Sequence, residues 1–363
     1  MKLQIYILTR LAAGVGAALA VILAVIMLVD LVELARTVGG RGDVAFDDLL
    51  GLTLLKTPSI ALLLAPFAFL FGSMGAFVTL NRRSELTAMR AAGVSAWRFL
   101  LPSALAAFLF GIMVVTALNP AAAFLNARFE ERRAWIAAGG GPATTPDIWL
   151  RQGAPEGQIV IHAKRRDTDN GDVTLKTVSI FIQTVSQTGD VDFTRRIDAA
   201  QAVLAPGYWR LSDVREARPG SESVRSDTLA LPTTLDRRSA MERFVAPGAV
   251  AFWNFPATVR AAERAGFSSA AYRLRYQQLL ATPLLFAAMT LLAAAFSLRL
   301  LRLGDVARVA AAGIGLGFLV FFLGQVCGAF GTTEVIPVPL AAWTPPLLAL
   351  LGAVTLLCHT EDG

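Results

Sequence analysis

Six long stretches without charged side chains most constrain how this chain can fold. Each has at least nineteen residues, is mostly apolar and lacks Asp, Glu, Lys and Arg: 11–29, 57–80, 99–127, 276–298, 309–333 and 335–358. A helix of about 20 apolar residues crosses the hydrocarbon core of a bilayer. The sequence therefore predicts six transmembrane helices, in keeping with a mean hydropathy of +0.56 and a charged fraction of 17%.

The charged residues are concentrated between the third and the fourth apolar stretch. Residues 128–275 hold 21 basic and 17 acidic residues, which is typical of a soluble domain. Segments 158–162, 178–182 and 208–211 are short and rich in β-branched or aromatic residues, as strands are. We therefore expect an α-helical polytopic membrane protein with an inserted all-β domain, folded as an antiparallel sandwich or an open roll.

The expected domains follow from these two patterns. Residues 1–127 hold the first three membrane helices, 128–250 the β-rich domain, and 251–363 a connecting amphipathic helix and the last three membrane helices. Lys and Arg in short loops set the orientation of such a protein. Basic residues are frequent in 1–10, 81–98 and 299–308 and sparse in the alternate loops. This predicts both termini in the cytoplasm and the β-rich domain outside, which in a bacterium is the periplasm.

Several kinds of active site are absent from the sequence. There is no Gly-Lys pair and hence no P-loop, and there is no G-x-S-x-G or H-E-x-x-H motif. The two histidines, His162 and His359, and the two cysteines, Cys327 and Cys358, are too few for a metal cluster. We expect no catalytic residue, metal or cofactor in this chain. The diffuse net charge of +6 does not indicate a nucleic-acid partner.

The loop 81–98 is the most informative segment between two membrane helices. Asn81 or Ser84 can cap a helix, and Gly93 can end it in the left-handed conformation. The pattern therefore predicts a short helix at about 82–93.

One face of this helix would carry an apolar and charged knob. Leu86, Met89 and Arg90 share a face at i, i+3, i+4 spacing, and Glu85 lies one turn before Met89. Such a knob suits insertion into a groove on a cytosolic partner. A basic loop that only sets the topology explains the same composition.

The loop also carries a resemblance to a known family. Its pattern R-S-E-L-x-x-M-R-A-x-G-V-S, residues 83–95, resembles the coupling helix of the LptF/LptG permeases, which export lipopolysaccharide. The resemblance extends along the chain through 29–33, Pro58, Pro66-Phe67, 208–214, 272–276 with Pro283, and 336–345.

The resemblance implies the permease subunit of an ABC transporter that extracts lipopolysaccharide from the bacterial inner membrane. The implied partners are a second, LptF-like permease, a dimer of an LptB-like ATPase that binds ATP and Mg²⁺, and LptC-like and LptA-like jellyroll proteins. The inserted domain would be a jellyroll that joins theirs edge to edge.

The resemblance also implies roles for particular residues. The coupling residues would be Arg82, Glu85, Leu86, Met89, Arg90 and Gly93. Lipopolysaccharide carries phosphates and acyl chains, so its site should combine basic residues near the outer face with an apolar cavity. The candidates are Arg36, Arg41, Lys56, Arg128, Arg132 and Phe67. Each of these cations could instead be a solvated charge at the membrane surface.

Two further sets complete the candidate residues. Gly313, Gly317, Gly324 and Gly328 lie near one face of the fifth membrane helix, either for tight packing or as part of a lateral gate. The β-domain interior would hold Ile159, Ile161, Ile180, Ile182 and Trp209, as a lipid path or as a simple core.

Two other functional classes remain open from the sequence. A permease of the lipoprotein-release type also lacks ATPase motifs, but it has four spans with the large domain after the first. A membrane enzyme acting on a lipid-linked substrate would need clustered carboxylates or histidines. Asp190, Asp192 and Asp198 beside Arg195 and Arg196 instead have the pattern of a turn with solvated charges.

Overall fold

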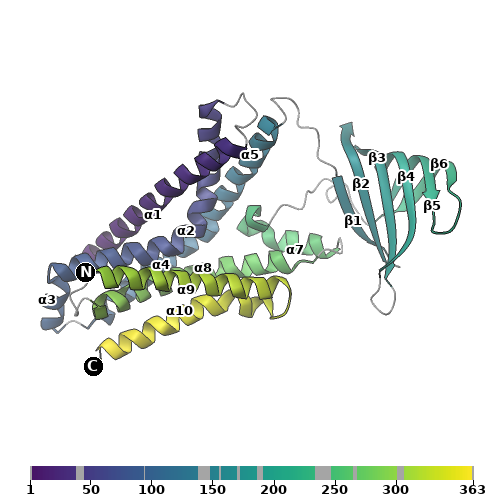
Figure 1. The fold of residues 1–363 in the computed structure, drawn as a ribbon. Helices are drawn as coiled ribbons and strands as arrows, with labels where there is room; N and C mark the ends of the chain where they lie inside the picture. The colour runs from purple at the N-terminus through teal and green to yellow at the C-terminus, as the bar shows by residue number, and fades with distance from the viewer. Residues whose placement is uncertain are drawn as a thin grey trace. The chain divides into compact units, whose positions relative to one another are not determined.

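The computed structural model describes residues 2–37, 45–93, 95–137, 148–154, 157–169, 172–185, 191–233, 247–264, 268–300 and 306–361. The chain forms two compact units (Figure 1). The helical unit comprises Met1–Arg133, Pro247–Phe255 and Ala270–Gly363, and the β unit comprises Ala134–Ala246 and Pro256–Ser269. The predicted site residue Arg41 lies outside the described residues.

The helices follow the charge-free stretches of the sequence. Their bounds are α1 Lys2–Thr37, α2 Phe46–Arg82, α3 Glu85–Ala91, α4 Trp97–Met113, a π-helical segment Val114–Leu118, α5 Asn119–Ala137, α7 Phe255–Arg264, α8 Ala270–Leu300, α9 Val306–Thr332 and α10 Val338–Glu361. Within the part of the chain that the structure describes, six helical segments are long and apolar enough to cross a membrane: Gln4–Thr37, Phe46–Arg82, Trp97–Ile136, Ala270–Leu298, Ala311–Thr332 and Val338–His359. The prediction of six membrane-spanning helices is confirmed.

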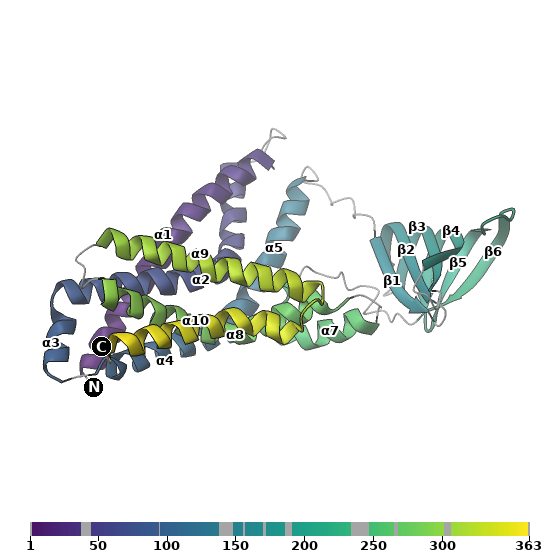
Figure 2. The same ribbon diagram turned by 60° about the horizontal axis from the view of Figure 1, so that its bottom comes forward.

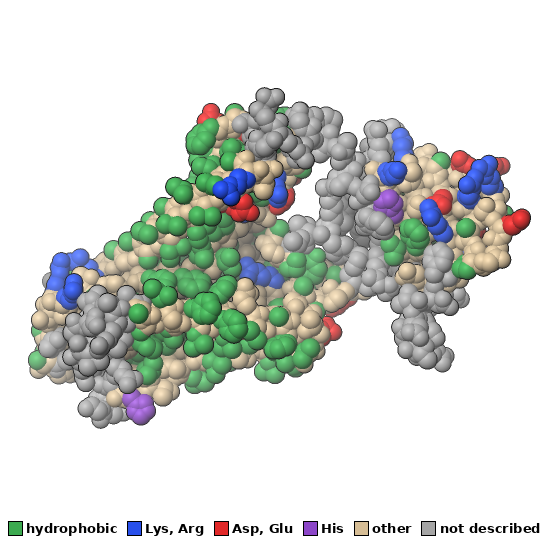
Figure 3. Space-filling view, viewed as in Figure 1, with side chains coloured by type: hydrophobic (Ala, Val, Ile, Leu, Met, Phe, Trp, Pro, Cys, Tyr) green, Lys and Arg blue, Asp and Glu red, His purple; other side chains and the backbone are tan. Residues whose placement is uncertain are grey.

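The helix α8 lies at the centre of the helical unit. It packs against α2, α4, α9 and α10, and Phe286, Ala288 and Ala293 on it are fully buried. By contrast, α1 and α9 expose large apolar side chains such as Val21, Leu28, Phe318 and Phe322. Figure 3 shows apolar side chains spread across the visible face of this unit. Such a surface suits contact with lipid or with other membrane helices.

Among the described residues, two of the helix crossings bring backbones so close that only glycine fits. A Cβ atom at Gly14 of α1 would lie 2.5 Å from the carbonyl oxygen of Gly72 on α2. A Cβ atom at Gly111 of α4 would lie 2.5 Å from the Cα of Pro283 on α8. Glycine lets membrane helices approach to backbone contact. These two crossings set the positions of α1 and α4 against the rest of the unit.

The described residues of the β unit form one antiparallel sheet of six strands in the order β1-β2-β3-β4-β5-β6 (Figure 2). The strands are β1 Ile148–Ala154, β2 Gly157–Asp169, β3 Asp172–Val185, β4 Val191–Ala205, β5 Tyr208–Ala217 and β6 Val224–Pro232. Each strand pairs with its neighbour in the sequence, so the sheet is a meander of hairpins. The expected inserted all-β domain is present, and a single sheet favours the open roll over the sandwich.

The sheet buries one of its two faces. Ile161 of β2 pairs with Ile180 of β3, which pairs with Ile197 of β4, and all three are at most 1% exposed. Alternate residues of a strand point to the same face, which explains the one-sided core. Of the five predicted interior residues, Ile159, Ile161, Ile180 and Trp209 are buried in this cluster and Ile182 packs against it.

Candidate functional site: a membrane cavity and a loop helix

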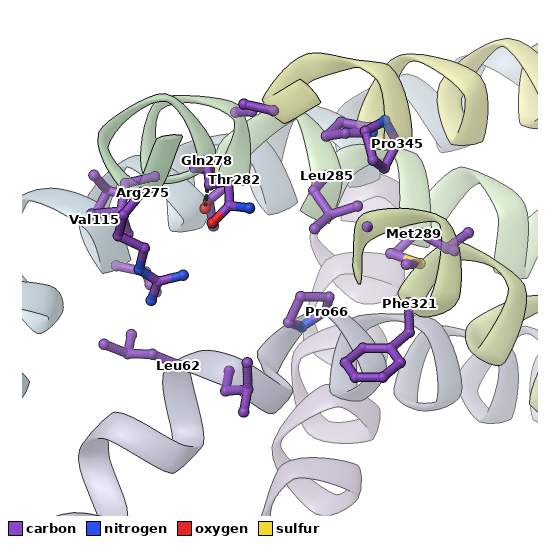
Figure 4. A pocket seen from close by; sticks show the side chains of 18 of the residues that line it. Leu62, Pro66, Val115, Arg275, Gln278, Thr282, Leu285, Met289, Phe321 and Pro345 are labelled. Atoms are coloured by element: carbon purple, nitrogen blue, oxygen red, sulfur yellow. Dashed lines mark hydrogen bonds between the residues drawn. The ribbon is translucent and has the colours of Figure 1, made fainter. Parts of the chain in front are cut away.

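A cavity of about 220 Å³ lies inside the helical unit (Figure 4). Residues of α2, the π-helical segment, α5, α8, α9 and α10 line it. Most of the lining is apolar: Leu62, Pro66, Phe67, Val115, Leu285, Met289, Val320, Phe321 and Pro345 are among these residues. The predicted lipid-binding residue Phe67 thus faces a real apolar space.

Helix irregularities explain why space remains there. Pro66 lies within α2, and Pro345 and Pro346 lie within α10. Proline removes a backbone hydrogen bond and bends a helix. The π-helical segment Val114–Leu118 interrupts the third span on another side of the cavity, and such bulges are frequent at functional sites. Because bent helices cannot pack evenly along their length, the cavity lies where they diverge.

Five polar side chains also line the cavity: Asn119, Arg275, Gln278, Thr282 and Gln325. Asn119 Oδ1 accepts a hydrogen bond from the Phe252 backbone N–H at 2.8 Å. The Thr282 hydroxyl donates to the Gln278 backbone oxygen at 2.9 Å. Among the described residues, the Arg275 guanidinium has neither a carboxylate nor a hydrogen-bond partner. Figure 4 shows it extending from α8 in the direction of Leu62 on α2.

Sequence reasoning did not select Arg275 as a site residue. The available signal was its place at the edge of the fourth apolar stretch, since an ionisable residue within a membrane helix is often functional.

The four predicted glycines of α9 do not share one interface. A Cβ at Gly313 would lie 2.7 Å from the Met74 sulfur of α2, and one at Gly317 would lie 3.1 Å from a Leu70 methyl group. A Cβ at Gly324 would meet nothing within 4 Å, and one at Gly328 would lie 3.6 Å from Gln278 Nε2. Two of the glycines therefore serve packing against α2, whereas Gly324 borders the cavity.

Two predicted lipid-binding arginines lie on the surface. Arg36, at the end of α1, is exposed and lines a shallow groove with Leu28, Val32 and Glu33. Arg128 of α5 is exposed, and its guanidinium lies 5.3 Å from the centre of the Phe124 ring. These positions leave both cations accessible to an anionic lipid group.

The other two described candidates, Lys56 and Arg132, are held by carboxylates. The Lys56 ammonium group pairs with Asp30 of α1 and lies 5.8 Å from the centre of the Phe129 ring on α5. The Asp30 side chain is 7% exposed. Arg132 Nη2 donates to Asp48 Oδ1 at 2.9 Å. Lys56 therefore ties α1 to α2 and α5, a structural role that the sequence reasoning missed.

The loop helix is shorter than predicted. Helix α2 continues to Arg82, and α3 comprises only Glu85–Ala91, where the sequence predicted 82–93. Ser84 has a φ of 59°, and this left-handed residue separates the two helices. Gly93 has a φ of 79°, as its predicted role in ending the helix requires.

The predicted exposed knob is wrong for Leu86. This side chain is 1% exposed and belongs to the core of the helical unit, and Met89 packs against the same core. A side chain buried in its own chain cannot fill a partner's groove in this conformation. Leu86 instead anchors α3 to the membrane helices. The Arg90 side chain lies outside the described part of the chain.

Glu85 links α3 to the beginning of α1. The Tyr6 hydroxyl donates to Glu85 Oε1 at 3.3 Å, and Arg10 Nε donates to the Tyr6 oxygen at 3.3 Å. Arg82, at the end of α2, is exposed. Figure 3 shows Lys and Arg side chains gathered at the end of the helical unit that carries α3. This end therefore offers charged groups on an anchored helix.

Among the described residues, the carboxylates of the β unit do not form an enzyme-like cluster. Asp198 accepts hydrogen bonds from the Ser179 hydroxyl at 2.6 Å and from Arg196 Nη2 at 3.0 Å. Burial alone would raise the pKa of Glu216, but hydrogen bonds from Arg218 and Arg195 lower it below its usual value. A general acid needs a raised pKa. The residues that the structure describes include no group of His, Cys, Asp and Glu that could hold a metal ion.

Comparison with known families decides between the open classes. The family model of the lipopolysaccharide export system permease LptF/LptG matches residues 5–359. The chain belongs to the LptF/LptG family. It is therefore a non-catalytic permease subunit of the lipopolysaccharide export system and, with its six membrane spans, a multi-pass inner-membrane protein. A comparison with curated proteins found no match.

Proposed function

We propose that this chain is the LptG subunit of a lipopolysaccharide exporter. It would pair with an LptF-like permease, extract lipopolysaccharide from the inner membrane and pass it to LptC-like and LptA-like jellyroll proteins. An LptB-like ATPase dimer would supply the energy from ATP and Mg²⁺. The segment 29–33 after the first span and the hairpin residues Trp209-Arg210-Leu211 resemble LptG more than LptF.

The observation that carries this proposal is the apolar cavity. Phe67, Leu285 and Phe321 line a space next to the buried core of the helical unit. Apolar walls with a few polar groups suit the acyl chains and headgroup of a lipid. A helix bundle with only a structural role has no need of such a space, because protein interiors are close-packed.

The proposed orientation follows from the basic loops. Both termini and α3 would be cytoplasmic and the β unit periplasmic. Glu85 would then face the ATPase, and Leu86, buried beside it, would transmit the motion of α3 to the membrane helices. The exposed cations Arg36 and Arg128 would contact the phosphates of lipopolysaccharide near the outer face.

The variant Glu85→Lys tests the coupling role. Loss of one partner of a desolvated charge pair costs about 2–5 kcal/mol of binding free energy. We expect the variant to reach the membrane with its partners but to lose lipopolysaccharide-stimulated ATP hydrolysis and transfer to an LptA-like protein. Glu85→Gln keeps the shape and a hydrogen-bond acceptor, so it should retain more of the stimulated ATP hydrolysis and of the transfer than Glu85→Lys. Normal hydrolysis and transfer by Glu85→Lys would contradict the proposal.

Co-expression tests the choice of subunit. The chain should form a stable, ATPase-binding complex with the LptF-like paralogue of the same organism. Assembly with an LptG-like paralogue in its place would assign this chain to LptF.

A further inference from the structure

We propose that Arg275 forms an anion subsite in the membrane cavity and binds a phosphate group of the transported lipid. The acyl part of the same molecule would lie against Phe67, Leu285 and Phe321. The inference rests on the proposed lipid transport and specifies a residue and a chemical group for it.

The first argument is the missing counter-charge. Lys56 pairs with Asp30 and Arg132 pairs with Asp48, but Arg275 has no carboxylate or hydrogen-bond partner among the described residues. It is half-buried within the span Ala270–Leu298. A cation in apolar surroundings is unfavourable unless it is paired. A ligand with a negative charge would supply the pairing that the protein omits.

The second argument is the arrangement of donors around the guanidinium. Gln278 follows Arg275 by one helical turn and lines the same cavity, as does Gln325 of α9. Neither glutamine side chain has a hydrogen-bond partner within the described residues. An arginine fork can bind two oxygens of a phosphate at once, and side-chain amides can donate to a third. The cavity thus offers cationic and neutral donors together.

The third argument is size. The cavity of about 220 Å³ is smaller than the range of about 300–1,000 Å³ typical of sites that enclose a whole small ligand. It therefore suits one part of a large lipid. Its lining shares no residue with the groove beside Arg36, so the two cations would contact different groups.

The test compares Arg275→Gln with Arg273→Gln in the assembled transporter. Arg273 is exposed on the same helix two residues earlier, which makes it a matched control for the lost charge. Binding of three probes to the complex in nanodiscs is measured: lipopolysaccharide, the same lipid after enzymatic dephosphorylation, and phosphatidylglycerol. A fourth sample contains inorganic phosphate.

Arg275→Gln should weaken lipopolysaccharide binding by about ten-fold or more, as expected for a hydrogen bond to a charged group. Arg273→Gln should leave it unchanged, and the dephosphorylated lipid should bind the wild type and Arg275→Gln equally. Equal affinity of both variants for lipopolysaccharide would overturn the subsite. A loss of affinity confined to phosphatidylglycerol or inorganic phosphate would also overturn it, because Arg275 would then bind phosphate from another source.

Two further outcomes keep the test decisive. If the wild type binds no lipopolysaccharide, the proposed transport function itself fails, whereas binding that is insensitive to Arg275 removes only the subsite. If Arg275→Gln does not assemble, Arg275→Lys retains the charge without the planar fork. It should lower the affinity for phosphorylated lipid several-fold and leave that for the dephosphorylated lipid unchanged. Unchanged affinity for both lipids would overturn the inference.

Discussion

The ion pair between Lys56 and Asp30 gives a prediction that separates structural from lipid-binding roles. Lys56→Met removes the cation and leaves the Asp30 carboxylate 7% exposed. One of its oxygens, Oδ2, has no hydrogen-bond partner among the described residues even in the wild type. Lys56→Met should therefore destabilise the protein strongly, because a buried charge loses the cation that pairs with it.

The magnitude follows from burial. Two unit charges about 4 Å apart interact by about 4 kcal/mol at an effective dielectric constant of about 20. Removing one partner of a buried pair costs about 3–5 kcal/mol. The Lys56 side chain is 34% exposed, so solvent screens part of the interaction. We therefore expect Lys56→Met to lower the free energy of unfolding by about 3 kcal/mol. Asp30→Asn, which leaves the more exposed cation, should cost about 1 kcal/mol. The double variant should be more stable than Lys56→Met alone.

The assay is unfolding of the purified permease complex in detergent, followed by tryptophan fluorescence, with all four members of the double-mutant cycle. The interaction term should be about 2 kcal/mol. An interaction term near zero would refute the reasoning. Lys56 would then be free to contact lipid, as the sequence indicated. Lipopolysaccharide binding by the refolded double variant should remain close to that of the wild type.

Two further predictions concern other contacts of α1. Tyr6→Phe removes the hydrogen bond to Glu85. It should lower lipopolysaccharide-stimulated ATP hydrolysis while reducing the free energy of unfolding by only about 1 kcal/mol. Full stimulation of ATP hydrolysis would show that the Tyr6–Glu85 contact is dispensable. Gly72→Leu should destabilise the protein by about 3 kcal/mol or prevent assembly, since its Cβ would lie 2.6 Å from the Val15 backbone nitrogen. Gly75→Leu on the same helix is the control, because a Cβ at Gly75 would meet nothing within 4 Å. Equal melting temperatures of the two variants would contradict the close crossing of α1 and α2.

The sequence predicted the features that depend on local patterns. Charge-free length alone located all six spans, because the hydrocarbon core admits few charges. Short segments rich in β-branched residues indicated the strands that carry Ile159, Ile161 and Ile180, and these side chains are buried together in the sheet. The positive φ of Gly93 followed from its place after a short helical pattern. Each of these inferences used residues within one element.

The sequence could not predict contacts between distant elements. Asp30 and Lys56 lie 26 positions apart, and nothing in either local pattern specifies their pairing. The same holds for Gly14 and Gly72, whose meeting depends on how α1 crosses α2. Leu86 was misjudged for a related reason. Its helical position defines a face, but only the packing of α3 against the membrane helices decides whether that face is buried.

These contacts together suggest how a force on the loop helix would reach the proposed lipid-binding side. Helix α1 buries little of its length, so discrete contacts hold it in place: Tyr6 with Glu85 at one end, Gly14 against Gly72, and Asp30 with Lys56 towards the other end. Leu86 fixes α3 to the same unit. In the proposed coupling, a displacement of α3 would be transmitted to α1 through Glu85 and to α2 through the chain itself. Since packed interfaces shift between discrete arrangements rather than deform continuously, weakening Tyr6–Glu85 should affect energy coupling, whereas weakening Asp30–Lys56 should affect how α1 is held near Arg36.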